Sequence, residues 1–174
     1  MPSGSTCLKV EPPPTPLGWS NRPPDGITYD TSMTGPQVVI DTNVFVAALR
    51  SQLGAAYHLL TQLGTGKFEM NLSVPLVLEY EDVAKRQADE LGLSDRDIAD
   101  IIDYFCSIGV PHKIYYLWRP FLEDAKDDMV LEVAVAGQCA YIVTYNERHF
   151  RGVGQFGLKV VTPQKLLREI GALS

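Results

Sequence analysis

Hydrophobic residues follow two alternating spacings along the chain from residue 37 onward. Short apolar runs rich in β-branched residues or tyrosine predict strands at 37–40, 68–72, 113–117, 140–144 and 158–161. Between them, apolar residues recur at helical spacing within segments 43–63, 74–86, 94–108, 127–136 and 163–170. Because strands and helices alternate, we expect a three-layer α/β/α fold with a central, mostly parallel sheet.

Turn and cap residues set the expected ends of these elements. Gly54 interrupts the first helical segment and could divide it in two. Ser73 is placed to cap the second helix, with Pro75 tolerated in its first turn. Ser94 and Asp97 resemble a capping box at the start of the third helix.

The first 35 residues differ from the rest of the chain. They have neither helical nor strand periodicity and contain seven prolines, of which six interrupt a polar, Gly/Ser-containing segment: Pro12, Pro13, Pro14, Pro16, Pro23 and Pro24. This composition predicts a disordered or loosely packed arm over 1–35. Residues 36–174 are then the folded domain, which is long enough to bury a full core.

Cysteine usage and hydropathy indicate a cytoplasmic protein. The three cysteines are far apart, which argues against a disulfide framework and a zinc-binding pair. Cys106 and Cys139 fall on apolar segments, so we expect both in the core. No apolar run approaches the roughly 20 residues that span a bilayer, and no membrane association is expected.

The formal net charge of −6 argues against a protein that binds nucleic acid mainly by covering phosphates with basic side chains. It leaves open an enzyme whose carboxylates hold divalent cations. The cations then provide the positive charge that a phosphate needs.

Four polar residues have related positions in the predicted topology. Asp41 ends the first strand, Glu79 lies in the helix after the second, Asp127 opens the fourth helix, and Asn146 lies two residues beyond Thr144. In a doubly wound sheet all four can face the crevice at the carboxyl ends of the strands. Taken singly, each has a plain alternative: Asp41 or Asp127 as a helix cap, Glu79 as a solvated residue, Asn146 as a turn former.

Carboxylates gathered in one crevice repel each other unless a cation compensates them. Mg²⁺ binds through one or two carboxylates, keeps several waters and leaves positions for a phosphate. Such a metal can activate water and stabilise charge on a phosphate under attack. The pattern therefore favours phosphate chemistry at a metal site.

Four separated segments resemble the PIN-domain family, in the same order and spacing: VVIDTNVFVAAL, LVLEYEDVAKR, DAKDDMVLEVAVA and YIVTYNERHF. The likeness runs from about Gln37 to Leu167 and is strongest to the branch of toxin components of toxin–antitoxin pairs, relatives of the VapC toxins. It implies a PIN-like fold in which the acids matching Asp41, Glu79 and Asp127 are catalytic metal ligands. Asn146 stands where many relatives have Asp, and its side chain offers a metal a carbonyl oxygen but no negative charge.

The same resemblance implies several further roles. Asn43 and Thr144 match residues that orient the carboxylates or water, and Asp124 and Asp128 are neighbours of the third acid. The implied activity is endoribonuclease cleavage of RNA phosphodiester bonds with Mg²⁺ or Mn²⁺. The implied partners are a second copy in a homodimer and an antitoxin protein.

Basic residues beside Asn146 have two interpretations. Arg148 and Arg151 could contact the RNA backbone or be ordinary surface charges. His149 could act as a general base, although a structural histidine beside Phe150 is the favoured interpretation.

Other functions fit less well. A haloacid-dehalogenase phosphatase needs a second Asp two residues after the first, and Asn43 stands there. A response-regulator receiver needs acidic residues that we cannot place. The non-enzymatic alternative is a catalytically weak PIN-like module that binds RNA or a protein partner, and Asn146 and the low basicity favour it.

Overall fold

The structure is a computed structural model that describes residues 35–115, 117 and 119–173. The predicted arm over 1–35 lies outside the described residues except for Gly35. Gly35 donates its N–H to the Gly66 carbonyl at 3.2 Å. A side chain on Gly35 would meet the Lys67 carbonyl oxygen at 2.1 Å, so only glycine fits this approach to the chain before the second strand.

Five strands of the described chain form one sheet, and every pairing between neighbours is parallel. Their spatial order is β3-β2-β1-β4-β5. The strands are β1 (Gln37–Ile40), β2 (Glu69–Leu72), β3 (Val110–Pro111), β4 (Tyr141–Val143) and β5 (Lys159–Val161). The predicted parallel sheet is confirmed.

The order of the strands reverses at β1. The chain proceeds from β1 to β2 and β3 on one side, and then to β4 and β5 on the other. The carboxyl ends of β1 and β4 are therefore neighbours, and this switch point is where open α/β sheets bind ligands.

Helices follow each strand except β4, after which two short 3₁₀ turns occur. The α-helices of the described chain are α1 (Thr42–Arg50), α2 (Ala55–Leu60), α3 (Val74–Arg86), α4 (Ala88–Leu91), α5 (Asp95–Ile108), α6 (Ala125–Ala136) and α7 (Pro163–Glu169). The 3₁₀ turns are η1 (Glu147–Phe150) and η2 (Val153–Phe156). None of the described helices is long and apolar enough to cross a membrane.

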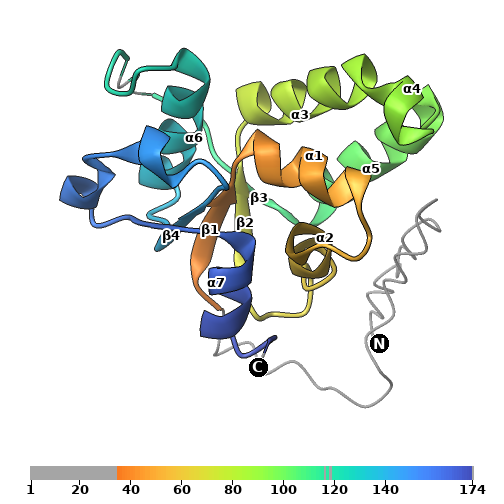
Figure 1. Cartoon of the computed structure of the whole chain (residues 1–174). Coiled ribbons are helices and arrows are strands. Elements are labelled where there is room, and N and C mark those ends of the chain that lie inside the picture. The colour runs from red at the N-terminus through yellow and green to blue at the C-terminus, as the bar shows by residue number, and fades with distance from the viewer. Residues whose placement is uncertain (1–34, 116, 118, 174) are drawn as a thin grey trace, which may run out of the picture.

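The helices cover both faces of the sheet, as the three-layer expectation requires. Helix α6 contacts β1, β2 and β4. Figure 1 shows α6 on one side of β1 and the pair α1 and α2 on the other, with α7 against α2. Helix α3 contacts both α1 and α6, so it bridges the two layers above the carboxyl ends of the strands.

An aromatic cluster fixes α1, α3 and α5 against one another. Phe45 stacks on Tyr80 with ring centroids 4.8 Å apart, and Phe105 meets Phe45 edge-on at 5.5 Å. The Tyr80 hydroxyl donates a hydrogen bond to the Ile40 carbonyl at the end of β1. Burial, and then the nearby Asp41 carboxylate, raise the pKa of Tyr80 well above its usual value, so the phenol stays protonated as a donor. Helix α3 is thereby attached beside Asp41.

The predicted strand over 113–117 is wrong. The third strand is β3, at residues 110–111, and the residues after it that the structure describes are irregular. It begins directly after α5 because Gly109 lies so close to Leu72 that a Cβ would meet its Cδ1 at 2.4 Å. Tyr115 is 77% exposed, so the apolar run that suggested a strand does not enter the core.

Three smaller points concern element ends and burial. The segment 43–63 forms two helices, as the position of Gly54 allowed, with Ser51 ending α1 and Gly54 capping α2. Helix α6 begins at Ala125 rather than Asp127, because the Asp124 carboxylate accepts from the Lys126 N–H and caps it. Cys139 is buried as expected, and burial raises its pKa to about 12, but Cys106 is exposed.

Candidate active site

The candidate site lies at the switch point between β1 and β4. Asp41 follows β1, and its N–H donates to the Val143 carbonyl of β4 at 2.9 Å. Thr144 follows β4, and its hydroxyl donates to the Asp41 Oδ2 at 2.6 Å. Both residues are buried, Asp41 at 6% exposure and Thr144 at 0%. Pairing of two adjacent strands therefore positions the carboxylate.

Asn43 completes a hydrogen-bonded network around Asp41. Its amide nitrogen donates to the Asp41 Oδ2 at 2.8 Å and to the Thr144 Oγ1 at 3.1 Å. Its amide oxygen accepts the Tyr145 N–H at 3.2 Å, while the Asn146 N–H donates to the Thr144 Oγ1 at 2.9 Å. Asn43 and Thr144 therefore both hydrogen-bond the Asp41 carboxylate, and the orienting role that the resemblance implies for them stays a prediction.

Asp127 lies in the first turn of α6, which covers this end of the sheet. It is 9% exposed, and its Oδ2 lies 3.1 Å from the Nδ1 of His149 in η1. The contact gives His149 a partner and holds its ring at the edge of the site, which the sequence did not indicate. The structural role favoured for His149 stays a prediction.

The electrostatics connect Asp41 with Asp127. Burial raises the pKa of Asp41, hydrogen bonding to Thr144 opposes that rise, and the Asp127 charge adds to it. Burial likewise raises the pKa of Asp127, with His149 opposing and Asp124 and Asp128 adding. Two carboxylates are thus held partly dehydrated within range of each other's charge, which is an arrangement that a cation would stabilise.

Glu79 lies near this pair but is directed to another partner. Its side chain is 15% exposed, and its Oε1 accepts from the Lys126 Nζ at 2.7 Å. The contact joins α3 to the start of α6, one residue before Asp127. Within the residues that the structure describes, no group of three or more His, Cys, Asp or Glu side chains is close enough to hold a metal ion. The shared ligand role of Asp41, Glu79, Asp127 and Asn146 therefore stays a prediction.

The remaining candidates have distinct positions. Asn146 is exposed, and it precedes η1 as its cap residue. Asp124 caps α6 at the surface. Asp128 is 1% exposed and accepts the Leu122 N–H at 2.8 Å and the Phe121 N–H at 3.3 Å. Asp128 therefore holds the loop before α6.

A second contact fixes the same loop. Arg119 donates from Nε and one terminal nitrogen to the two carboxylate oxygens of Glu132, both at 3.1 Å. Glu132 is 3% exposed, so this pair anchors the loop to the buried side of α6.

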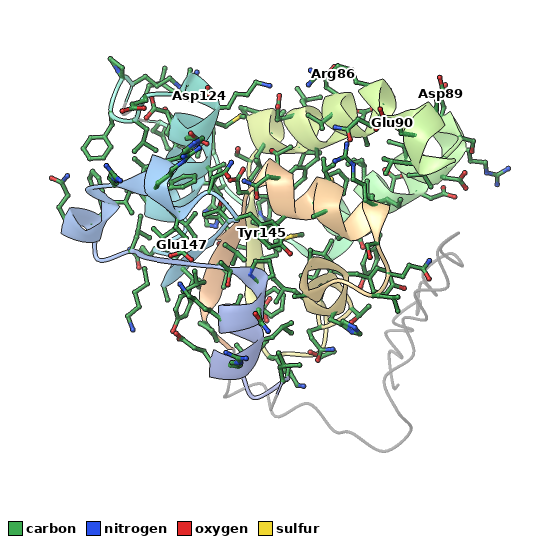
Figure 2. All side chains as sticks on the ribbon, viewed as in Figure 1. Arg86, Asp89, Glu90, Asp124, Tyr145 and Glu147 are labelled. Carbon is green, nitrogen blue, oxygen red and sulfur yellow. The ribbon has the colours of Figure 1, made fainter. Side chains whose placement is uncertain are left out.

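Figure 2 shows how the labelled acids are distributed. Asp124 lies at the start of α6, whereas Asp89 and Glu90 lie in α4, just after the C-terminal end of α3. Tyr145 and Glu147 lie in the segment after β4. The acids of α4 are thus separate from the candidate site.

Sequence reasoning missed Lys126 and the contact of His149 with Asp127. Nothing in the spacing marks Lys126, because its partner Glu79 is 47 residues away. The contact of His149 with Asp127 likewise joins residues 22 positions apart, on η1 and α6, so local spacing does not mark it.

A comparison with protein-family models finds one match, described as PIN domain, over residues 37–148. It covers more than half of the chain. No curated protein matches the sequence.

Proposed function

The chain belongs to the PIN-domain family, whose members are usually metal-dependent nucleases, and we propose that it is an endoribonuclease that uses Mg²⁺ or Mn²⁺. The observation that carries this proposal is the pair Asp41 and Asp127. Both side chains are buried at the switch point of the sheet, burial raises the pKa of each, and the Asp127 charge adds to the rise at Asp41. Carboxylates with pKa values raised in this way are typical of functional sites.

The donor set fits a hard divalent cation. Asp41 and Asp127 supply carboxylate oxygens, and Mg²⁺ commonly takes only one or two carboxylates from the protein with water completing its shell. When bound there, the metal would supply positive charge to a phosphate and lower the pKa of a bound water. Glu79 and Asn146 are the further proposed ligands, and the oxygen of Glu79 is at present held by Lys126.

The protein's own residues would prepare the site for a phosphodiester. Asn43 and Thr144 both donate to the same oxygen, Asp41 Oδ2. They fix the carboxylate and prevent it from rotating away. Asp127 holds the Nδ1 side of His149, so the ring keeps one orientation at the edge of the site.

The test is cleavage of RNA by the purified full chain. We expect internal cuts in single-stranded RNA when Mg²⁺ or Mn²⁺ is added, and no cuts in excess EDTA. Restoring the metal after EDTA should restore cleavage. Cutting that persists in EDTA would contradict the proposal.

A catalytically weak module that binds RNA or a protein is the second candidate. Two observations favour it: the described residues contain no three-residue metal cluster, and Glu79 is paired with Lys126. Calorimetric titration with Mn²⁺ separates the candidates. Saturable binding supports the nuclease, whereas its absence together with retained RNA binding supports the module.

The biological role that we propose is that of the toxin in a toxin–antitoxin pair, from the resemblance of the four segments to that branch. By the same resemblance the enzyme would form a homodimer and be inhibited by an antitoxin. We expect its production in a bacterial host to arrest growth, and light scattering to give the mass of two chains. Normal growth with full cleavage activity would contradict the toxin role, and the mass of one chain would contradict the dimer.

A further inference from the structure

A pocket of about 470 Å³ opens beside the acidic pair on the side of η1. Its lining residues are Phe121, Leu122, Glu123, Arg148, His149 and Arg151. The volume is in the range of small-ligand pockets, about 300–1,000 Å³. His149 belongs both to this pocket and to the contact with Asp127, so the pocket adjoins the candidate active site.

The pocket is basic in a chain that is acidic overall. Arg148 and Arg151 are both exposed, and neither forms an ion pair with any residue in the described part of the chain. Glu123 is the acidic residue of the lining. Glu147, next to Arg148, is paired with Lys165 at 2.7 Å, so it does not neutralise the arginine. Two guanidinium groups are therefore available to an anion.

The pocket also offers an aromatic ring. Phe121 is 37% exposed, and its ring packs edge-on against Phe156 with centroids 5.3 Å apart. The Phe121 N–H donates to the Asp128 carboxylate, so the backbone that carries the ring is held in place. A partly exposed aromatic ring beside cationic groups is the combination on which single-stranded nucleic acids bind.

We propose that this pocket is a nucleotide subsite that selects single-stranded RNA, with a base against Phe121 and a phosphate against Arg148 and Arg151. The inference rests on the proposed nuclease function, because it places the neighbouring phosphate of the same strand at Asp41 and Asp127. A base can enter a concave pocket only when it is unstacked from its neighbours, so paired RNA is excluded. Planar guanidinium groups suit phosphate oxygens better than lysines would.

The experiment measures binding without catalysis. Fluorescence anisotropy in EDTA is recorded for a short labelled single-stranded RNA, and for the same strand annealed to its complement. Gel analysis afterwards checks that the RNA is intact. Because no metal is needed, this measurement reports on the subsite even if the protein proves not to be a nuclease.

The double variant Arg148→Gln/Arg151→Gln should bind the single strand at least about tenfold more weakly, since two charge-assisted contacts are lost. Its plot of log affinity against log salt should be shallower by about 0.7, because the two arginines share one phosphate and each phosphate contact on a single strand contributes about 0.7. Phe121→Ala should weaken binding by about 5–150-fold, the range for loss of one base–aromatic stack, with an unchanged salt slope.

The matched control is Arg96→Gln/Arg168→Gln, which removes the same charge from exposed positions on α5 and α7. It should retain both affinity and salt slope. Equal weakening by the two double variants, or duplex binding as tight as single-strand binding, would overturn the subsite. If the subsite results hold but wild-type protein never cleaves RNA with metal, the nuclease proposal fails and the subsite stands.

Discussion

Asp41→Asn should lower the rate of RNA cleavage by at least about a thousandfold, and should also make the metal-free protein more stable. A bound metal contributes several kcal/mol of transition-state stabilisation, and each 1.36 kcal/mol is a factor of about ten in rate. Asparagine retains an oxygen that can accept from Thr144 and Asn43, so the network around position 41 should persist. The loss would therefore come from the missing charge.

The gain in stability follows from the direction of the pKa shift. The pKa of Asp41 is raised above its usual 3.8 in the folded protein, first by burial and then by the Asp127 charge. The folded state therefore binds this proton more tightly than the unfolded state does. Below pH 3.8 the carboxyl group is protonated in both states and its shift does not destabilise the protein. As pH rises from 3.8 through the folded-state pKa, the free energy of unfolding falls, because the buried carboxylate must then carry its charge.

Urea unfolding in EDTA, from acidic to neutral pH, measures this effect. The difference in stability between Asp41→Asn and wild type should grow with pH and then level off. Asp89→Asn is the control, because Asp89 is an exposed acid on α4, far from the site (Figure 2). A difference that does not change with pH would show that the pKa of Asp41 is not raised in the folded protein.

Asp128→Ala should destabilise the protein by about 3 kcal/mol. Asp128 is fully buried and accepts the N–H groups of Phe121 and Leu122. Hydrogen bonds to a charged group contribute about 1.5–3 kcal/mol each, and one of these two is longer than usual. Urea unfolding at neutral pH gives the free energy directly.

Two companion variants separate structure from chemistry at this position. Asp128→Asn keeps an acceptor oxygen, so it should lose less stability and retain cleavage. Asp124→Ala should lose only about 1 kcal/mol, the usual contribution of a helix cap. If Asp128→Asn abolished cleavage in a protein of normal stability, Asp128 would be a metal ligand rather than the support of the loop.

The meeting of Asp41 and Thr144 at one edge of the sheet could be predicted because it depends on the strongest patterns in the chain. The apolar run before Asp41 and the one before Thr144 each identify a buried strand, and parallel strands place their carboxyl ends at one edge. The structure pairs these two strands directly. The hydrogen bond between Thr144 and Asp41 follows from that pairing.

Side-chain partners could not be predicted, because they depend on how helices pack rather than on local pattern. The pairing of Glu79 with Lys126 needs the relative position of α3 and α6. The buried role of Asp128 needs the path of the preceding loop. The sequence groups Asp124, Asp127 and Asp128 together, whereas the fold gives each a different environment.

The misplaced third strand has a similar cause. A two-residue strand at the edge of a sheet carries almost no periodicity of its own, and the stronger apolar run at 113–117 misled the prediction. Its position is decided by the close approach of Gly109 to Leu72. That contact between the end of α5 and β2 has no signature in the spacing of apolar residues.

The hydrogen bond between Thr144 and Asp41 joins residues 103 positions apart in the chain. During synthesis, the first strand leaves the ribosome long before its partner exists, so an unfinished chain lacks the Thr144 contact and has only the nearby Asn43 to hold Asp41. The full set of hydrogen bonds to Asp41 therefore forms only after β4 and Thr144 have been synthesised. A fragment that ends before Thr144 should lack the arrangement on which the proposed activity depends.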